Sequence, residues 1–196
     1  LAVFVVAPNP SALLEYFSKN KEKTFPLFYE HLIQKEKKYI FQSGTLKKAP
    51  AVLQQHIGIE LPMPKIFKPF LPDSIPNFVA YRYFNARETD SPIMFLLFSR
   101  QPLPQNLDKE WLASFRQKKI GAFYRGDTFP LADSHFEETV VNDYPAYRLR
   151  SYWQNYEEFI GGIFETYAIP YKNKVVIIDL MIYPEMFARD GWRIFS

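Results

Sequence analysis

The pattern of apolar and polar positions changes about a third of the way along this 196-residue chain. Between residues 10 and 56, apolar residues recur every three or four positions, which is typical of amphipathic helices. From Ile59 to Tyr183, short apolar runs and two-residue alternation dominate, which is typical of strands. The sequence therefore predicts a helical N-terminal part followed by a β-rich part.

The N-terminal part opens with the apolar run Leu1–Ala7, which predicts a buried strand. A turn follows, and the spacing of apolar residues then predicts three helices. Pro26 is tolerable because it falls in the first turn of the second helix, where a backbone N–H has no intrahelical partner. Gly58 marks the end of the third. The predicted helices cover residues 11–20, Thr24–Phe41 and Leu46–His56.

The second part predicts six strands, an extended segment over Ile59–Pro64 and a long central helix. Asp108 is placed to cap that helix, and Trp111, Leu112 and Phe115 form its apolar stripe. A further helix is expected from Met186 onward. The predicted strands are Phe78–Phe84, Ile93–Phe98, Phe136–Val141, Ala146–Trp153, Ile163–Ile169 and Val175–Tyr183.

These elements predict an α+β fold. We expect a twisted antiparallel sheet with helices packed on its faces, preceded by a strand–helix–helix segment. Turn signals at Asn142-Asp143 and at Lys172-Asn173 favour hairpins between neighbouring strands. The change of pattern near Gly58 predicts two subdomains, residues 1–57 and residues 58–196. Since no flexible linker separates them, we expect the two to pack together.

Composition excludes several classes of chemistry. The chain has no Cys, which excludes disulfides, thiol catalysis and zinc sites built on Cys. Its 7 Gly do not form a phosphate-binding loop. The aromatic fraction is high at 18%, and no apolar run reaches the length needed to span a membrane. We therefore expect no cofactor.

The net charge of +3 is unevenly distributed. Residues 1–53 carry 8 Lys and 4 Glu, and the lysines alternate with acidic residues rather than forming an arginine-rich stripe. Nucleic-acid binding through these lysines is one hypothesis, but we interpret them as a solvated helix face and expect no nucleic-acid partner. The main contributors are Lys19, Lys21, Lys23, Lys35, Lys37 and Lys38.

Candidate acid–base residues do not form a recognisable catalytic motif. His31, His56 and His135 show no metal-binding spacing, so we expect no metal site. The pairs Glu137-Glu138 and Glu157-Glu158 suggest glycosidase chemistry, but neighbours in a strand point to opposite faces. A hydrolase or lyase acting on an envelope glycan remains an alternative. It requires folding to bring at least two of Glu137, Glu157, Asp179 and His135 within about 10 Å of each other in an open cleft.

One strand suggests a candidate binding surface. Alternation over Ala146–Trp153 places Arg148, Arg150 and Tyr152 on one face, which either binds an anionic partner or is an ordinary solvated side of a sheet. The double glycine Gly161-Gly162 either lets a backbone approach a ligand or bends the chain into the next strand. We favour the structural interpretation in both cases. The full candidate surface is Arg148, Arg150, Tyr152, Trp153, Gly161, Gly162 and Phe164.

Two resemblances bear on this interpretation. From about Ile57 on, the segments IELPMPKIF, NFVAYRYF and IMFLLF, followed by a helix, strands and a last helix, resemble the fold shared by the photosystem oxygen-evolving protein P and the Ran-binding protein Mog1. Those relatives are adaptors or binding modules rather than one enzyme family.

The second resemblance covers most of the chain. The segments IGIELPMPKIF, NFVAYRYF, RLRSYWQNYEEFIGGIFETY and VVIIDLMIYPE look like the Bacteroidetes envelope lipoproteins called domain of unknown function 4837. Trp153, Gly161, Gly162 and Phe164 match that family's Trp followed by Gly-Gly-Pro-Phe, whereas Ile163 stands where the family has Pro and Ser151 where we expect Gly.

This resemblance implies a periplasm-facing protein of the outer membrane, attached by a lipid anchor whose Cys would precede Leu1. It implies no known activity. We therefore expect a non-enzymatic cell-envelope module that binds a protein or an envelope component, with no residue assigned a catalytic role. The sequence leaves its partner and oligomeric state open.

Overall fold

The computed structural model describes residues 8–70, 75–83, 93–121, 127–157 and 159–183. The strand expected at Leu1–Ala7 and the helix expected from Met186 lie outside these residues. The chain divides into two compact units, Leu1–Thr45 and Leu46–Ser196. The predicted boundary after residue 57 falls inside the second unit, directly after its first helix.

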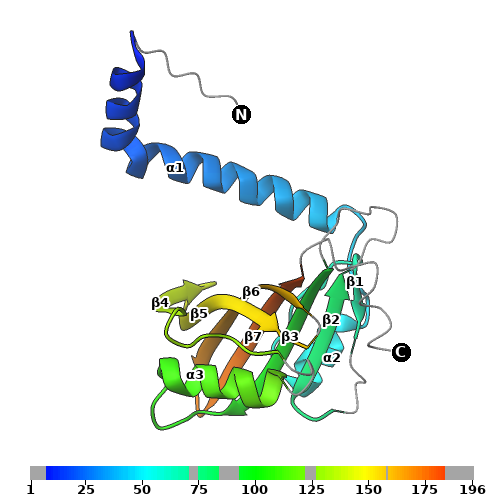
Figure 1. Cartoon of the computed structure of the whole chain (residues 1–196). Helices are drawn as coiled ribbons and strands as arrows, with labels where there is room; N and C mark the ends of the chain where they lie inside the picture. Colours follow the sequence, from blue (N-terminus) through cyan, green and yellow to red (C-terminus); the bar gives the residue numbers. More distant parts are fainter. Residues whose placement is uncertain (1–7, 71–74, 84–92, 122–126, 158, 184–196) are drawn as a thin grey trace. The chain divides into compact units, whose positions relative to one another are not determined.

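The first unit contains one helix, α1 (Pro10–Phe41), where we predicted two. Asn9 begins it, because its side-chain oxygen accepts a hydrogen bond from the N–H of Ala12 at 2.8 Å. The separation into two helices was wrong, since residues 20–24 contain no glycine and include good helix formers. Figure 1 shows α1 bent along its length, and Pro26 within it has no N–H to donate.

The second unit is built on a seven-stranded sheet in which every neighbouring pair is antiparallel. The spatial order is β1-β2-β3-β7-β6-β5-β4, so β7 lies between β3 and β6. Figure 1 shows the twist of this sheet. The predicted α+β fold is confirmed. The strands are β1 (Phe67–Pro69), β2 (Phe78–Tyr83), β3 (Ile93–Pro102), β4 (His135–Val141), β5 (Tyr144–Asn155), β6 (Ile160–Tyr171) and β7 (Lys174–Tyr183).

Tight turns connect β4 to β5 and β6 to β7, and they fix the register of each pair. Asn142 and Asp143 have φ values of 49° and 67°, and positive φ at both central residues is what the favoured two-residue hairpin turn requires. Lys172, between β6 and β7, has a φ of 56°. Both hairpins predicted from turn residues are confirmed. By contrast, the extended segment expected at Ile59–Pro64 forms no regular strand, because its prolines have no N–H to donate to a neighbouring strand. The edge strand of the sheet is β1.

Helices cover both faces of the sheet (Figure 1). On one face, α3 (Lys109–Phe115) buries Leu112 and Phe115 against a cluster that includes Ile177 and Met181 of β7. It continues into the π-helical turn η1 (Arg116–Ile120). The predicted cover of the sheet by this helix is confirmed. Asp108 caps it by accepting a hydrogen bond from the N–H of Trp111 at 2.8 Å.

The opposite face carries α2 (Ala49–His56). Leu53 and Ile57 are fully buried there with Phe98 of β3, and Val176 and Ile178 of β7 belong to the same cluster. Full burial of an aliphatic side chain of this size stabilises a fold by about 1.5–3 kcal/mol. Since α2 packs on the sheet, it belongs structurally to the second unit.

Gly162 allows the indole of Trp153 to lie flat across β6. The two residues face each other in the β5–β6 register, and the indole N–H donates to the carbonyl oxygen of Ile182 at 3.3 Å. A Cβ at position 162 would clash with that oxygen and lie 2.9 Å from Trp153 Nε1. The buried Trp153 therefore requires glycine at this position.

Gly162→Ala is expected to lower the free energy of unfolding by about 1–3 kcal/mol, because the added methyl group overpacks a filled site. Urea unfolding followed by circular dichroism measures this. Gly121→Ala is the matched control, since a Cβ there meets neighbours only at 3.6 Å. Equal stability of the two variants would contradict the account of Trp153.

Candidate functional site

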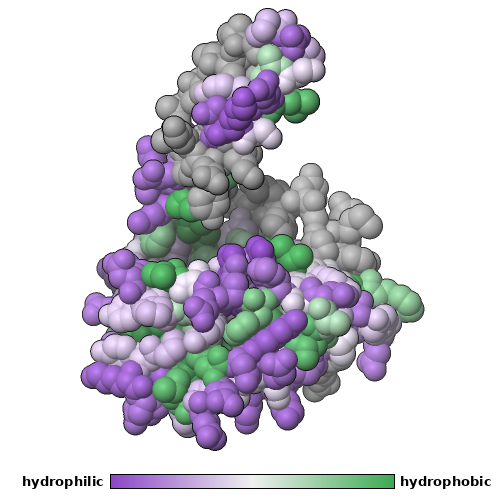
Figure 2. Space-filling view, turned by 90° about the vertical axis from the view of Figure 1, so that its left-hand side faces the viewer, coloured by the Kyte–Doolittle hydropathy of each residue, from purple (hydrophilic) through white to green (hydrophobic). Residues whose placement is uncertain are grey.

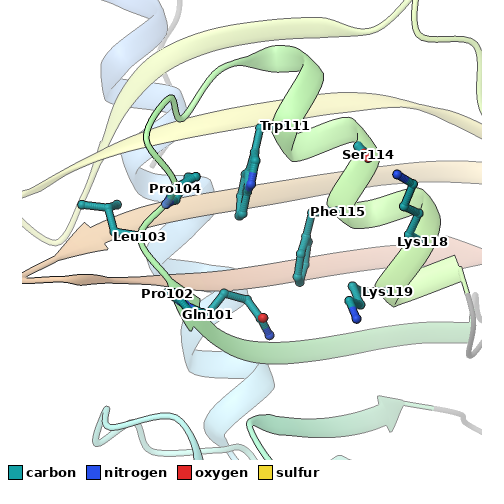
Figure 3. A pocket seen from close by; sticks show the side chains of 9 residues that line it. All are labelled: Gln101, Pro102, Leu103, Pro104, Trp111, Ser114, Phe115, Lys118 and Lys119. Atoms are coloured by element: carbon teal, nitrogen blue, oxygen red, sulfur yellow. The ribbon is translucent and has the colours of Figure 1, made fainter.

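An open groove runs between α3 and the segment that connects it to β3 (Figure 3). Its volume is about 350 Å³, which lies near the lower end of the range for ligand sites. The lining residues are Gln101, Pro102, Leu103, Pro104, Trp111, Ser114, Phe115, Lys118 and Lys119. All of them belong to the second unit.

Two stacked aromatic rings form the centre of this groove. Trp111 and Phe115 are one helical turn apart, with ring centroids at 5.5 Å and ring planes inclined by 14°. Phe115 is buried and Trp111 is half-buried, so the pair belongs both to the core and to the surface. Figure 3 shows Leu103 and Pro104 beyond Trp111, which extend the apolar wall.

Lys118 and Lys119 line the other end of the groove (Figure 3). Both side chains are exposed, and neither forms an ion pair with another residue that the structure describes. None of the described residues that line the groove is acidic. The groove therefore has an apolar end and a cationic end.

A buried ion pair fixes the helical segment that carries these lysines. Arg116 Nε lies 3.0 Å from Asp179 Oδ2, and both side chains are almost completely buried. Thr166 donates its hydroxyl to the same carboxylate oxygen at 2.5 Å. The guanidinium carbon lies 3.6 Å from the ring centroid of Phe164, close enough for a cation–π contact. These contacts tie η1 to β6 and β7.

A second polar contact holds η1 from its other side. Gln117 donates to the backbone carbonyl of Asp127 at 2.9 Å. The buried Asp127 carboxylate in turn accepts hydrogen bonds from Asn155 at 3.1 Å and from Tyr183 at 3.5 Å. Arg116 and Gln117 on η1 thus contact β7, β6 and the segment at Asp127. These contacts position Lys118 and Lys119, which follow directly.

The residues predicted as a binding surface lie on both faces of the sheet. Arg148, Arg150 and Tyr152 lie on the face opposite α3. Trp153 and Phe164 are buried in the core beneath α3, and Gly161 and Gly162 make room for the Trp153 backbone and ring. The structure therefore does not bring the seven residues together into one surface.

Arg148 is the centre of a cross-strand network on that face. It donates two hydrogen bonds to Glu137 on β4 and lies 3.8 Å from Glu165 on β6. Tyr167 donates to Glu165 at 2.8 Å. Arg148 is therefore neutralised by neighbouring carboxylates, whereas Arg150 on the same strand is exposed.

This network shifts the ionisation of its members. The Arg148 guanidinium lowers the pKa of Glu137, with a smaller contribution from a hydrogen bond to His135. Burial, followed by the hydrogen bond to Glu165, raises the pKa of Tyr167. A hydrogen bond to Asp133 raises the pKa of Tyr152. These shifts stabilise the charged form of Glu137 and the neutral forms of the two tyrosines, and they do not prepare a proton donor near neutral pH.

Folding brings together His135 and Glu137, two of the four side chains considered for glycan cleavage, but neither is among the described residues that line the groove. His135 and Glu137 are 3.3 Å apart on the face opposite α3, whereas Asp179 is buried on the α3 face. Glu157 is exposed in the turn after β5. Across the described ranges, no three His, Cys, Asp or Glu side chains are placed to hold a metal ion.

Figure 2 shows one side of the molecule, on which hydrophobic residues are interrupted by hydrophilic ones. Exposed apolar side chains scattered in this way are ordinary for a protein surface. No helix in the described part of the chain is long and apolar enough to cross a membrane.

Sequence reasoning missed the groove, although part of its signal was visible. Trp111 and Phe115 were predicted as a core stripe, and Lys118 and Lys119 follow them directly. Leu103 lies between two prolines just before the helix. These two sequence features indicate a groove only when the helix and the proline-rich connection are known to lie next to each other, and the sequence does not show that.

No protein-family model matches the chain, and no curated protein matches its sequence. Among solved structures, cyanobacterial PsbP (CyanoP) from Synechocystis sp. PCC 6803 is similar over 69% of this chain and 80% of its own, with 12% identity and a TM-score of 0.41. The Ran-binding protein Mog1p of Saccharomyces cerevisiae matches 69% of this chain and 77% of its own, with 11% identity and a TM-score of 0.40.

LpqN, described as involved in cell envelope biogenesis of Mycobacterium tuberculosis, matches 69% of this chain and 78% of its own, with 16% identity and a TM-score of 0.35. These similarities concern the fold. They carry no information about what this chain binds.

Removing one member of the buried ion pair is expected to be costly. Asp179→Leu should lower the free energy of unfolding by about 3–5 kcal/mol, because it leaves the Arg116 charge buried without a partner. The triple variant Arg116→Met/Thr166→Val/Asp179→Leu should recover most of that loss, since no polar group of the pair remains unsatisfied. Urea unfolding measures both. A single variant as stable as the wild type would contradict this account.

Arg148→Met is expected to raise the pKa of Glu137 back toward its ordinary value, because Arg148 is the largest cause of the lowered pKa. Carboxyl titration by NMR measures this shift. Because the pKa of Glu137 is lowered in the folded protein, its ionisation stabilises the fold at neutral pH. This stabilisation is lost as the pH falls through the folded-state pKa. An unchanged titration of Glu137 in the variant would overturn this assignment.

Proposed function

We propose that the protein is a non-enzymatic binding module of the cell envelope, and that the groove beside α3 holds a protein partner. The observation that carries this proposal is the groove itself. It combines the stacked rings of Trp111 and Phe115 with two exposed lysines in one concave site. Aromatic side chains at the centre of a surface depression are the usual anchors of protein binding.

The placement of the ionisable residues supports a binding role over a catalytic one. Among the parts of the chain that the structure describes, the groove lining has no carboxylate or histidine that could move a proton. Asp179 is engaged with Arg116 and Thr166, and Glu137 is engaged with Arg148. His135 and Glu137 lie close to each other but are not among the described residues that line the groove, so we do not favour the glycan-directed hydrolase or lyase considered from the sequence.

The envelope location rests on the sequence segments that resemble domain of unknown function 4837. Under this proposal the chain is a periplasm-facing lipoprotein of a Bacteroidetes outer membrane, with its lipid anchor attached upstream of Leu1. The similarity to LpqN concerns the fold and is not evidence for an envelope location. The exposed face that carries Arg150 and Tyr152 is a secondary candidate surface.

Panning a phage-displayed library of random twelve-residue peptides against the full chain tests this proposal. We expect enriched peptides whose affinity falls at least tenfold when Ser114→Trp fills the groove or when Trp111→Ser removes its anchor. Ser114 is exposed, so its replacement leaves the core intact.

Tyr156→Ser is the matched control, because it removes an exposed aromatic ring from the β5–β6 turn, outside the groove. Circular dichroism of each variant shows that the fold persists. The proposal fails if no peptide is enriched, or if the enriched peptides bind the wild type and the Ser114→Trp variant equally well. Peptides lost only in Arg150→Glu would transfer the function to the opposite face.

A further inference from the structure

We infer that the occupant of the groove is a short, extended protein segment with an apolar end and an acidic end. The inference rests on the proposed function and adds the chemistry and direction of the ligand. In the bound segment, apolar side chains lie against Leu103, Pro104 and Trp111, and carboxylates lie against Lys118 and Lys119.

Charge complementarity determines the acidic end. Lys118 and Lys119 are exposed side by side at one end of the groove, and its lining, as far as the structure describes it, includes no acidic residue. The remaining cation of this turn, Arg116, is already paired with Asp179 and lies inside the core. Only the two lysines are therefore available to a ligand, and they favour carboxylates.

The length of the groove limits the length of the segment. Trp111 and Lys119 are eight residues apart, which corresponds to about 12 Å along a helix. An extended chain advances about 3.3 Å per residue, so about four residues cover this distance. The ligand is therefore a linear motif rather than a folded domain or a long helix.

The polar groups of the groove favour a peptide backbone. Ser114 offers a hydroxyl, and Gln101 offers its amide oxygen and the N–H that remains after the amide donates to Ser99 at 2.8 Å. Together they supply both donors and acceptors, which a peptide needs and an acyl chain does not use. A sugar ring would need many polar partners, whereas the uncharged polar residues of the described lining are Gln101 and Ser114.

Two labelled hexapeptides test the inference on the full chain. The acidic probe has two leucines, a serine and three glutamates, and the basic probe has lysines in place of the glutamates. Fluorescence anisotropy should show that the wild type prefers the acidic probe by about tenfold in 50 mM salt. The preference should shrink at 500 mM salt, because salt screens exposed charges.

Charge reversal is the decisive variant. Lys118→Glu/Lys119→Glu should lose the acidic probe and gain the basic one, a gain that damage to the fold could not produce. Lys37→Glu/Lys38→Glu on α1 is the control, because it changes the net charge equally at exposed positions of the first unit. This control should leave both affinities unchanged.

Several outcomes would overturn the inference. These are an unchanged preference in the reversed variant, loss of the acidic probe without gain of the basic one, or an equal effect of the α1 control. Displacement of the acidic probe by phosphatidylglycerol vesicles but not by unlabelled acidic peptide would assign the groove to a lipid headgroup instead. If panning yields neutral peptides that depend on Trp111, the charge assignment fails and the proposed protein-binding function stands.

Discussion

The structure depends above all on the packing of α3 and its continuation η1 against the sheet. Leu112 and Phe115 close the core on one face of β7, and Arg116 is held by Asp179 in the same layer. The same two helical turns place Trp111, Lys118 and Lys119 along the groove. Because one segment closes the core and forms one wall of the groove, the shape of the groove follows from the packing of the core.

Charges occur in this protein in three different environments. The Arg116–Asp179 pair is buried and surrounded by hydrogen bonds and aromatic rings. Removing one partner therefore lowers the stability of the fold. Arg148 is half-exposed and neutralised by carboxylates on both neighbouring strands. Lys118 and Lys119 are exposed, adjacent and close to the apolar part of the groove, so they are free to bind a ligand of opposite charge.

Much of the fold could be predicted because the relevant interactions are local. Alternation over Ala146–Trp153 identified a strand and its buried face, and Asp108 identified the start of α3. The candidate surface was less predictable. Trp153 is three residues from Arg150 on β5, and Phe164 on β6 pairs with Ser151, yet both aromatic rings belong to the core under α3. Neighbouring residues of a strand point to opposite faces, so closeness in sequence did not imply a shared surface.

By itself, the sequence determined the classes of element, the two hairpins and the antiparallel character of the sheet, because periodicity and turn chemistry act over a few residues. Only the tertiary structure decided that α2 joins the sheet, that Gly162 makes room for Trp153, and that Leu103 faces the helix that carries Lys118. Each of these depends on which distant segments meet, and that is set by the packing of the whole core rather than by any local pattern.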